Sequence, residues 1–227
     1  MIKILLLVFL ACYWVIPFML TAGAGIGVLK RKRDSEKVAF TFDDGPNAIY
    51  TPQLLDLLKK HDVKATFFVV GSKAEKYPEI IARMHAEGHL IGIHNYKHKS
   101  NWIMSPWTIR SQLRKSASII EKTIGECPVY YRPPWGLLNL LDFTLRKQYK
   151  IIHWSVMAKD WKTNGGSQKV EKRLLRDIKK GDVVLLHDCG KTLGADEDAP
   201  LNTIIALKNV LKELSNRSVS CVRIDEL

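Results

Sequence analysis

Apolar and polar residues follow two different patterns along the chain. From Ile4 to Leu29 no charged residue occurs, and a run of that length can cross a lipid bilayer as a helix. Further along, short runs of Val, Ile and Phe alternate with stretches that carry apolar residues at helical spacing. The pattern predicts a membrane anchor or signal segment at 1–29, a basic linker at 30–37 and one domain at 38–227.

Within the domain, strands and helices are expected to alternate. The strands are predicted at 38–42, 64–70, 89–93, 129–131, 151–154, 183–186 and 220–223. The helices are predicted at 51–60, 73–87, 106–124, 138–148, 167–180 and 201–215. This alternation implies an α/β fold of about seven units, with parallel strands and crossover helices in a barrel or a doubly wound sheet. In either architecture, functional residues gather at the carboxyl ends of the strands.

The N-terminal apolar segment has two interpretations. Ala22-Gly23-Ala24 is similar to a signal-peptidase site, so cleavage and secretion are one outcome. The apolar run is longer than a usual signal core, however, and it contains Trp14 and Pro17. These features favour an uncleaved membrane anchor.

Charge narrows the choice of partners. The formal net charge is +12, of which residues 38–227 carry +8. Such a balance suits an anionic membrane surface, an acidic polymer or nucleic acid, but no nucleic-acid-binding motif is present. The cluster Lys30–Arg33 follows the apolar segment, and the positive-inside rule by itself favours a cytoplasmic domain. The four cysteines form no CxxC pair, so they indicate neither a zinc knuckle nor a disulfide framework.

Two adjacent carboxylates, Asp43 and Asp44, end the first predicted strand. Neighbouring side chains in an extended backbone point to opposite sides, so one carboxylate can bind a metal while the other accepts a proton. The alternative is a simple turn, since Asp44-Gly45-Pro46 is ordinary turn chemistry.

His94 and His98 follow the third predicted strand at a spacing that places both on one face of a helical turn. Together with Asp44 they form a set of two imidazoles and one carboxylate, which leaves a coordination position open, as a catalytic zinc requires. His85 and His89 have the same spacing, but they straddle Gly88 and a change from helix to strand. The spacing alone is therefore weak evidence, and the position at a strand end carries the prediction.

Three further residues lie at predicted strand ends. Arg132 precedes two prolines that stiffen its loop, and it can pair with Asp43 and hold that carboxylate ionised. Backbone N–H groups after Pro134 can face a developing oxyanion. His187 can serve as a general acid if a carboxylate such as Asp160 raises its pKa. The alternatives are a loop arginine that pairs with a surface carboxylate and a structural histidine.

In this order and at these intervals, the motifs resemble those of the polysaccharide deacetylase family (NodB-homology domain, carbohydrate esterase family 4). The resemblance covers roughly residues 37–227. It is carried by Thr41-Phe42-Asp43-Asp44-Gly45, His94-x-x-x-His98, Arg132-Pro133-Pro134-x-Gly136, Asp160-Trp161 and Leu186-His187.

The resemblance implies a distorted (β/α) barrel that hydrolyses N-acetyl groups on chitin-like or peptidoglycan glycans. It implies that Asp43 is the general base and His187 the general acid. Asp44, His94 and His98 would bind zinc, or cobalt or another divalent ion. The remaining residues would support catalysis or the substrate, with Arg132 orienting Asp43, Asp160 tuning His187, the Trp135 N–H stabilising the oxyanion, Pro134 shaping that loop, and Trp161 and Leu186 walling the acetyl pocket.

Three positions depart from the family pattern. Asn95 stands where Ser or Thr is usual between the histidines, which bears on metal affinity. Trp135 replaces the more usual Tyr, and Met157 lies where relatives often carry another Asp, which bears on the tuning of His187.

The sequence thus predicts a monomeric, membrane-tethered enzyme that deacetylates an amino-sugar polymer. The family's substrates place the catalytic domain on the extracytoplasmic side, against the positive-inside rule. Two alternatives stay open: an O-acetyl ester deacetylase, as on xylan, and a non-catalytic glycan-binding envelope protein on the same fold.

Overall fold

A fully buried strand, β1 (Val38–Asp43), lies at the centre of the sheet in the computed structural model, which describes residues 1–227. Its neighbours are β2 (Thr66–Val69) and β7 (Val183–His187), both parallel to it. Such a strand is covered on both faces, which explains why its sequence is apolar almost throughout.

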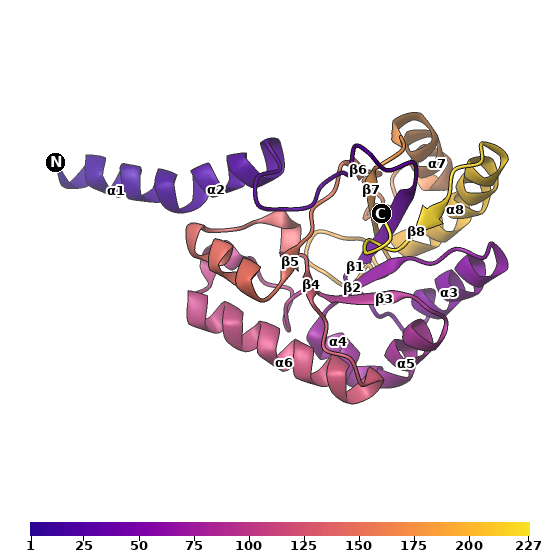
Figure 1. Ribbon diagram of the computed structural model, residues 1–227, viewed down its shortest axis with the longest axis horizontal. Helices are drawn as coiled ribbons and strands as arrows, with labels where there is room; N and C mark the ends of the chain where they lie inside the picture. Colours follow the sequence, from indigo (N-terminus) through magenta and orange to yellow (C-terminus); the bar gives the residue numbers. More distant parts are fainter.

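The strands follow the order β5-β4-β3-β2-β1-β7-β6, and every strand pairing is parallel. The remaining strands are β3 (Leu90–Ile93), β4 (Tyr130–Tyr131), β5 (Lys150–Ile151), β6 (Val156–Met157) and β8 (Cys221–Val222), which pairs with β1. Helices surround the sheet (Figure 1). They are α3 (Tyr50–Lys60), α4 (Gly71–Lys76), α5 (Pro78–Ala86), α6 (Pro106–Ile124), α7 (Gly166–Asp177) and α8 (Ala199–Asn216), with 3₁₀ turns η3 (Asn101–Ile103), η4 (Pro134–Gly136) and η5 (Leu140–Lys147).

The sheet curls into an incomplete barrel. Strands β5 and β6 lie at opposite ends of the strand order, yet only residues 152–155 connect them. Five residue steps reach at most ~18 Å, so the two edges of the sheet must approach each other. We call the place where these two edges approach each other the seam of the barrel. The segment before the domain also lies there, because Leu29 pairs with Ile152 and Arg31 with Asp182. The predicted distorted (β/α) barrel is confirmed.

Alternate residues of β1 face different surroundings. Phe40 and Phe42 pack in the main core between sheet and helices, whereas Ala39 belongs to a second, smaller cluster. Because side chains of a strand alternate, Thr41 and Asp43 share the side of Ala39, inside the barrel. This alternation carries polar side chains into the interior, close to the carboxyl end of the sheet.

Three predicted elements are wrong in detail. The helix expected at 73–87 is two helices, because Tyr77 leaves helical geometry and Pro78 begins α5. The segment expected as a helix at 138–148 is the 3₁₀ turn η5. The strand expected at 151–154 is replaced by the short strands β5 and β6, on opposite edges of the sheet.

The N-terminal helix runs from Ile2 to Gly23, through α1 (Ile2–Leu10), α2 (Ile16–Phe18) and the π-helical turns η1 (Ala11–Val15) and η2 (Met19–Gly23). It extends away from the barrel (Figure 1). By length and composition it is able to cross a membrane, and only 11% of its most apolar window is buried.

The seam makes a prediction for stability. Asp182 is fully buried, and its carboxylate accepts hydrogen bonds from Arg31, Ser155 and the Lys179 N–H. Asp182→Ala removes all three contacts of a fully buried carboxylate with part-buried donors, so the free energy of unfolding should fall by about 1–3 kcal/mol. Urea denaturation in detergent measures this loss. Asp177→Ala, which breaks an exposed pair with Arg176, should cost less than about 1 kcal/mol, and equal losses for both variants would contradict the prediction.

Candidate active site

The carboxyl ends of the parallel strands deliver the predicted residues to one place. Asp43 ends β1 and lies in register with His187 at the end of β7. His94 directly follows β3, and Arg132 directly follows β4. Asp160 comes after β6, not after the strand expected at 151–154. The strand ends, more than any single motif, assemble the site.

The Asp43 carboxylate is held by a fully buried arginine. Arg132 Nη1 lies 2.7 Å from Asp43 Oδ1 and also donates to Thr41 Oγ1 at 2.7 Å. The other guanidinium nitrogens donate to the carbonyls of Ile152 and His153. Since arginine stays charged when buried with such partners, Asp43 has a fixed position and a charge opposite it.

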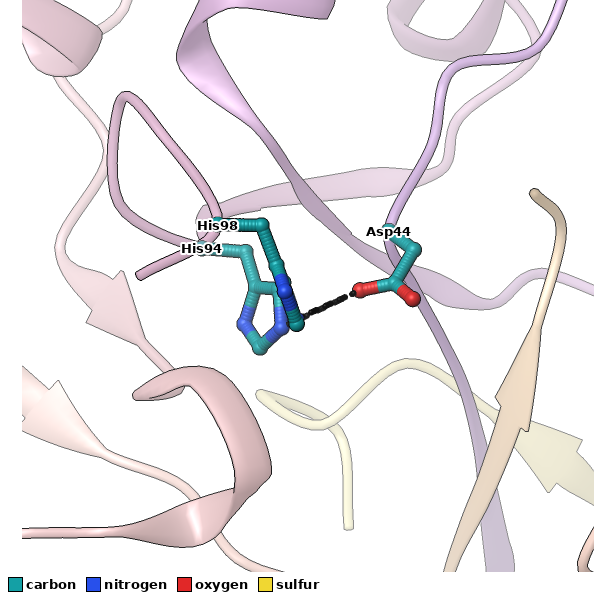
Figure 2. Close-up of side chains that lie close together, drawn as sticks. All are labelled: Asp44, His94 and His98. Carbon is teal, nitrogen blue, oxygen red and sulfur yellow. Dashed lines mark ion pairs between the residues drawn. The ribbon is translucent and has the colours of Figure 1, made fainter. Parts of the chain in front are cut away.

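Asp44, His94 and His98 form a compact group whose ligand atoms all lie within 4.8 Å of one another (Figure 2). Asp44 Oδ1 lies 3.1 Å from His98 Nε2 and 3.4 Å from His94 Nε2. Asp44 Oδ1 is buried and accepts no conventional hydrogen bond. Burial disfavours ionisation, but His94, His98 and His187 outweigh it and hold the pKa of Asp44 well below its usual value.

These three residues fit a divalent metal ion. His94 Nδ1 lies 2.7 Å from the Arg132 carbonyl oxygen, which can only accept, so that nitrogen carries the proton and Nε2 is free to coordinate. Two imidazoles and one carboxylate are a donor set that zinc prefers, with room for another ligand. The buried, unpartnered Asp44 Oδ1 is the oxygen such an ion would satisfy.

The two histidines do not share a helical turn, contrary to the sequence expectation. Residues 94–98 form a loop in which Asn95 has a positive φ of 58°. The loop is held by buried polar contacts. Asn95 accepts from the Tyr131 hydroxyl at 3.0 Å and donates to Asn101 at 3.0 Å. Asn101 donates in turn to Asp142 at 3.0 Å. Tertiary hydrogen bonds, not helical periodicity, bring His94 and His98 together.

His187 is paired with Asp160. Its Nδ1 lies 2.9 Å from Asp160 Oδ1, and its backbone N–H donates to Asp160 Oδ2 at 2.8 Å. Thr203 also donates to this carboxylate. Burial disfavours the protonated imidazole, but Asp160, followed by the charges of Asp44 and Asp43, raises the pKa of His187 to about 9. The site can therefore keep a proton on His187 at neutral pH.

A cavity of about 430 Å³ joins these groups. Its lining includes the acidic and imidazole groups Asp43, Asp44, His94, His98 and His187. Trp135 and Trp161 form part of its wall, and Trp135 adopts a positive φ of 56°. Pro134 is buried in the loop beside Trp135 and does not line the cavity.

Leu186 is not a wall of the cavity. It is fully buried in the core between sheet and helices, while Leu185 lines the cavity instead. Neighbouring residues of a strand point to opposite sides, so Leu185 shares the side of His187 and Leu186 does not. The sequence could have predicted this, because the residue two positions before His187 points to the same side of the strand as His187.

Two site residues were missed by sequence reasoning. Thr192 donates to Asp44 Oδ2 at 2.6 Å, and Lys73 donates to the Asp44 carbonyl at 2.7 Å. Lys73 comes from α4 and Thr192 from the loop after β7, and neither belongs to a motif. The only signal in the sequence was that both residues follow shortly after a predicted strand, where the site residues gather.

Comparison with known proteins now gives the family. The model of the family described as polysaccharide deacetylase matches residues 30–151. A peptidoglycan-N-acetylglucosamine deacetylase from Bacillus cereus is 40% identical over 153 residues, which are 66% of this chain and 55% of that protein. A second Bacillus cereus protein of the same name is 34% identical and is matched over 86% of this chain and 89% of its own length.

Solved structures agree. The crystal structure of the Bc1960 peptidoglycan N-acetylglucosamine deacetylase superposes with a TM-score of 0.80 at 31% identity, over 88% of this chain and 91% of that chain. The chain belongs to the polysaccharide deacetylase family. It spans only 55% of the length of the first relative described above.

The metal-ligand assignment predicts which variants lose metal. Asp44→Ala and His98→Ala each remove one of three protein ligands, so zinc affinity should fall at least ~100-fold. Titration with a fluorescent zinc competitor measures the affinity, and circular dichroism checks the fold. Asp43→Asn is the matched control, because it lies beside the group without belonging to it. Unchanged affinity in both ligand variants would contradict the assignment.

The buried polar network makes a separate prediction. Tyr131→Phe removes the hydroxyl that donates to Asn95 and loosens the loop between the two histidines. Zinc affinity should fall about 10-fold, the scale typical of residues that orient metal ligands. Tyr149→Phe is the control, because Tyr149 packs beside Tyr131 but lies outside the network. An equal effect of both variants would show that general packing, not the hydrogen bond, matters.

Proposed function

We propose that this protein is a metal-dependent hydrolase that removes N-acetyl groups from amino-sugar glycans such as peptidoglycan or chitin-like polymers. The observation that carries the proposal is the single cavity that Asp43, Asp44, His94, His98 and His187 line together. It combines a candidate base, a candidate metal site and a candidate acid. The names of the relatives, which refer to peptidoglycan and N-acetylglucosamine, support the choice of substrate.

Asp44, His94 and His98 would hold the divalent ion, for which zinc fits best and cobalt is an alternative. When bound, such an ion polarises the acetyl carbonyl and makes a nearby water more acidic. Asp43 lies beside this group, with Oδ2 3.9 Å from His94 Nε2, and it is the candidate general base that takes the proton from water. Arg132 holds that carboxylate in place through a 2.7 Å ion pair.

His187 is the candidate general acid. Because Asp160 binds Nδ1, Nε2 is the nitrogen left to protonate the leaving amine. The Trp135 N–H, which makes no hydrogen bond within the protein, is the candidate donor to the oxyanion. Trp161 and Leu185 shape the wall near the acetyl methyl group. The products are acetate and a free amino sugar.

We propose further that the protein is a monomer, anchored in the membrane with its catalytic domain at the membrane surface. The N-terminal helix supports the anchor. The helix is long enough to span a bilayer, and its α1 portion buries no side chain against the domain. Protease accessibility of a tagged protein in intact cells would assign the side of the membrane.

Acetate release tests the activity. We expect release from purified peptidoglycan or N-acetylglucosamine oligomers, abolished by a chelator and restored by zinc or cobalt. Acetylated xylan is the comparison for an O-acetyl ester deacetylase. Release from xylan alone would favour that alternative, and no release from any substrate with metal restored would favour a non-catalytic glycan-binding protein.

Two variants test the assigned roles. Asp43→Asn and His187→Ala should each lower kcat by about 10²–10⁴-fold, the usual range for loss of a general base or acid. Both should keep zinc, because neither is a proposed ligand. Asp56→Asn and His85→Ala are matched controls on surface helices. Near-native turnover in either test variant would overturn its role.

A further inference from the structure

The wall of the catalytic cavity includes residues of the N-terminal helix. Phe18 and Ala22 line the cavity together with the residues of the site, and so does Lys30, just beyond the helix. Lys30 is the only lysine or arginine in the lining, and its ammonium donates to the Ala22 carbonyl. The apolar segment is therefore part of the site's surface and not only a tether.

Aromatic contacts hold this part of the helix on the domain. The rings of Trp14 and Phe18 lie 6.5 and 6.1 Å from the ring of Trp102. Trp102 is fixed in turn, because its indole N–H donates to the Leu138 carbonyl at 3.0 Å. Pro17 and Thr21 are buried on the same helix. Since Trp102 follows the loop that carries His94 and His98, the helix is docked beside the catalytic loop.

The first part of the helix, α1, buries no side chain and extends away from the domain (Figure 1). At 1.5 Å per residue, α1 measures about 14 Å and the whole helix Ile2–Gly23 about 33 Å. The hydrocarbon core of a bilayer is about 30 Å thick, so α1 alone is too short to cross it and the docked part of the helix is needed as well. If the whole helix spans the membrane while Phe18 and Ala22 stay on the cavity, the cavity must lie directly at the membrane surface.

Exposed apolar side chains of the domain agree with this placement. Ile103, next to Trp102, is 78% exposed, and Leu193 in the cavity lining is 84% exposed. Leu140 and Leu141 are exposed on η5, which packs beside the helix. Apolar side chains near the end of a membrane helix are stabilised when they lie in the interfacial layer of the lipid, whereas exposure to water would favour aggregation.

We propose that the substrate is an N-acetylated amino sugar linked through phosphate to a lipid of the same membrane. This inference rests on the proposed deacetylase function and narrows its substrate. The lipid chain stays in the bilayer beside Phe18 and Leu193, the phosphate pairs with Lys30, and the acetamido group reaches Asp43 and His187. A lipid-linked sugar is delivered along the membrane to a cavity that already faces it.

The test uses the full-length protein in vesicles with zinc. One set of vesicles also contains an N-acetylglucosaminyl polyprenyl diphosphate, and a second set receives a soluble N-acetylglucosamine oligomer at the same bulk concentration. Sharing a membrane raises the effective concentration, so acetate release from the lipid-linked sugar should be at least ~10-fold faster. Placing the lipid-linked sugar in separate vesicles should remove this advantage.

Variants of the helix separate the site from simple tethering. Phe18→Asp puts a charge in the path of the lipid, so the ratio of lipid-linked to oligomer turnover should fall about 10-fold. Phe18→Leu should keep the ratio, and so should Val8→Ala, which lies far from the cavity. Protein recovered with the vesicles by flotation is measured for every variant.

The outcomes are distinct. Equal or faster release from the soluble oligomer, or an equal fall of both activities in Phe18→Asp, overturns the lipid-linked substrate and leaves the deacetylase intact. Release from neither substrate, with metal restored, overturns the deacetylase function and this inference with it.

Discussion

The buried guanidinium of Arg132 is the constraint on which the site depends. It lies inside the barrel, 4.2 Å above the ring of Phe68, where removing a charge from water costs several kcal/mol. Burial lowers its pKa, and Asp43 opposes that shift. A buried arginine needs hydrogen-bond partners, and four are present: two come from β1 and two from the chain just after β5. These bonds tie the central strand β1 to the chain after the edge strand β5 at the functional end of the sheet.

The same residue organises both halves of the proposed chemistry. Its side chain holds the candidate base Asp43, and its carbonyl oxygen sets the tautomer of His94. Asp44 follows Asp43 with a φ of 75°, which turns its carboxylate toward the histidines. Strained backbone of this kind persists only where surrounding contacts hold it. Here Thr192 and Lys73 supply those contacts.

The sequence pattern predicted parallel strands with crossover helices, in a barrel or a doubly wound sheet, and the family resemblance selected the barrel. The pattern also placed the candidate site residues at strand ends, because parallel strands leave a strong pattern. Each buried strand is a short apolar run, and a polar residue follows at its carboxyl end. The errors arose where tertiary contacts override local pattern. The short strand β6 is defined by pairing with β7, which no local feature announces. The loop from His94 to His98 has helical spacing, but the hydrogen bonds of Asn95 give it another shape. The assignment of Leu186 rather than Leu185 to the cavity wall was avoidable, since strand alternation decides which of the two shares the side of His187.

The N-terminal segment shows how a boundary drawn on composition can hide a functional connection. Charge and hydropathy separate an apolar segment, a basic linker and a domain, and each reads as an independent part. The structure joins them, because Leu29 and Arg31 pair at the seam of the barrel and Phe18 lines the cavity. A helix docked in this way cannot move freely from the site it flanks. If the helix remains in the membrane, the bilayer surface borders the path by which a substrate enters the cavity. The basic residues after the helix favour a cytoplasmic domain, whereas deacetylation of a cell-wall polymer requires an extracytoplasmic one. A substrate that resides in the bilayer removes this conflict, because a lipid-linked sugar does not require the domain to reach a distant cell wall.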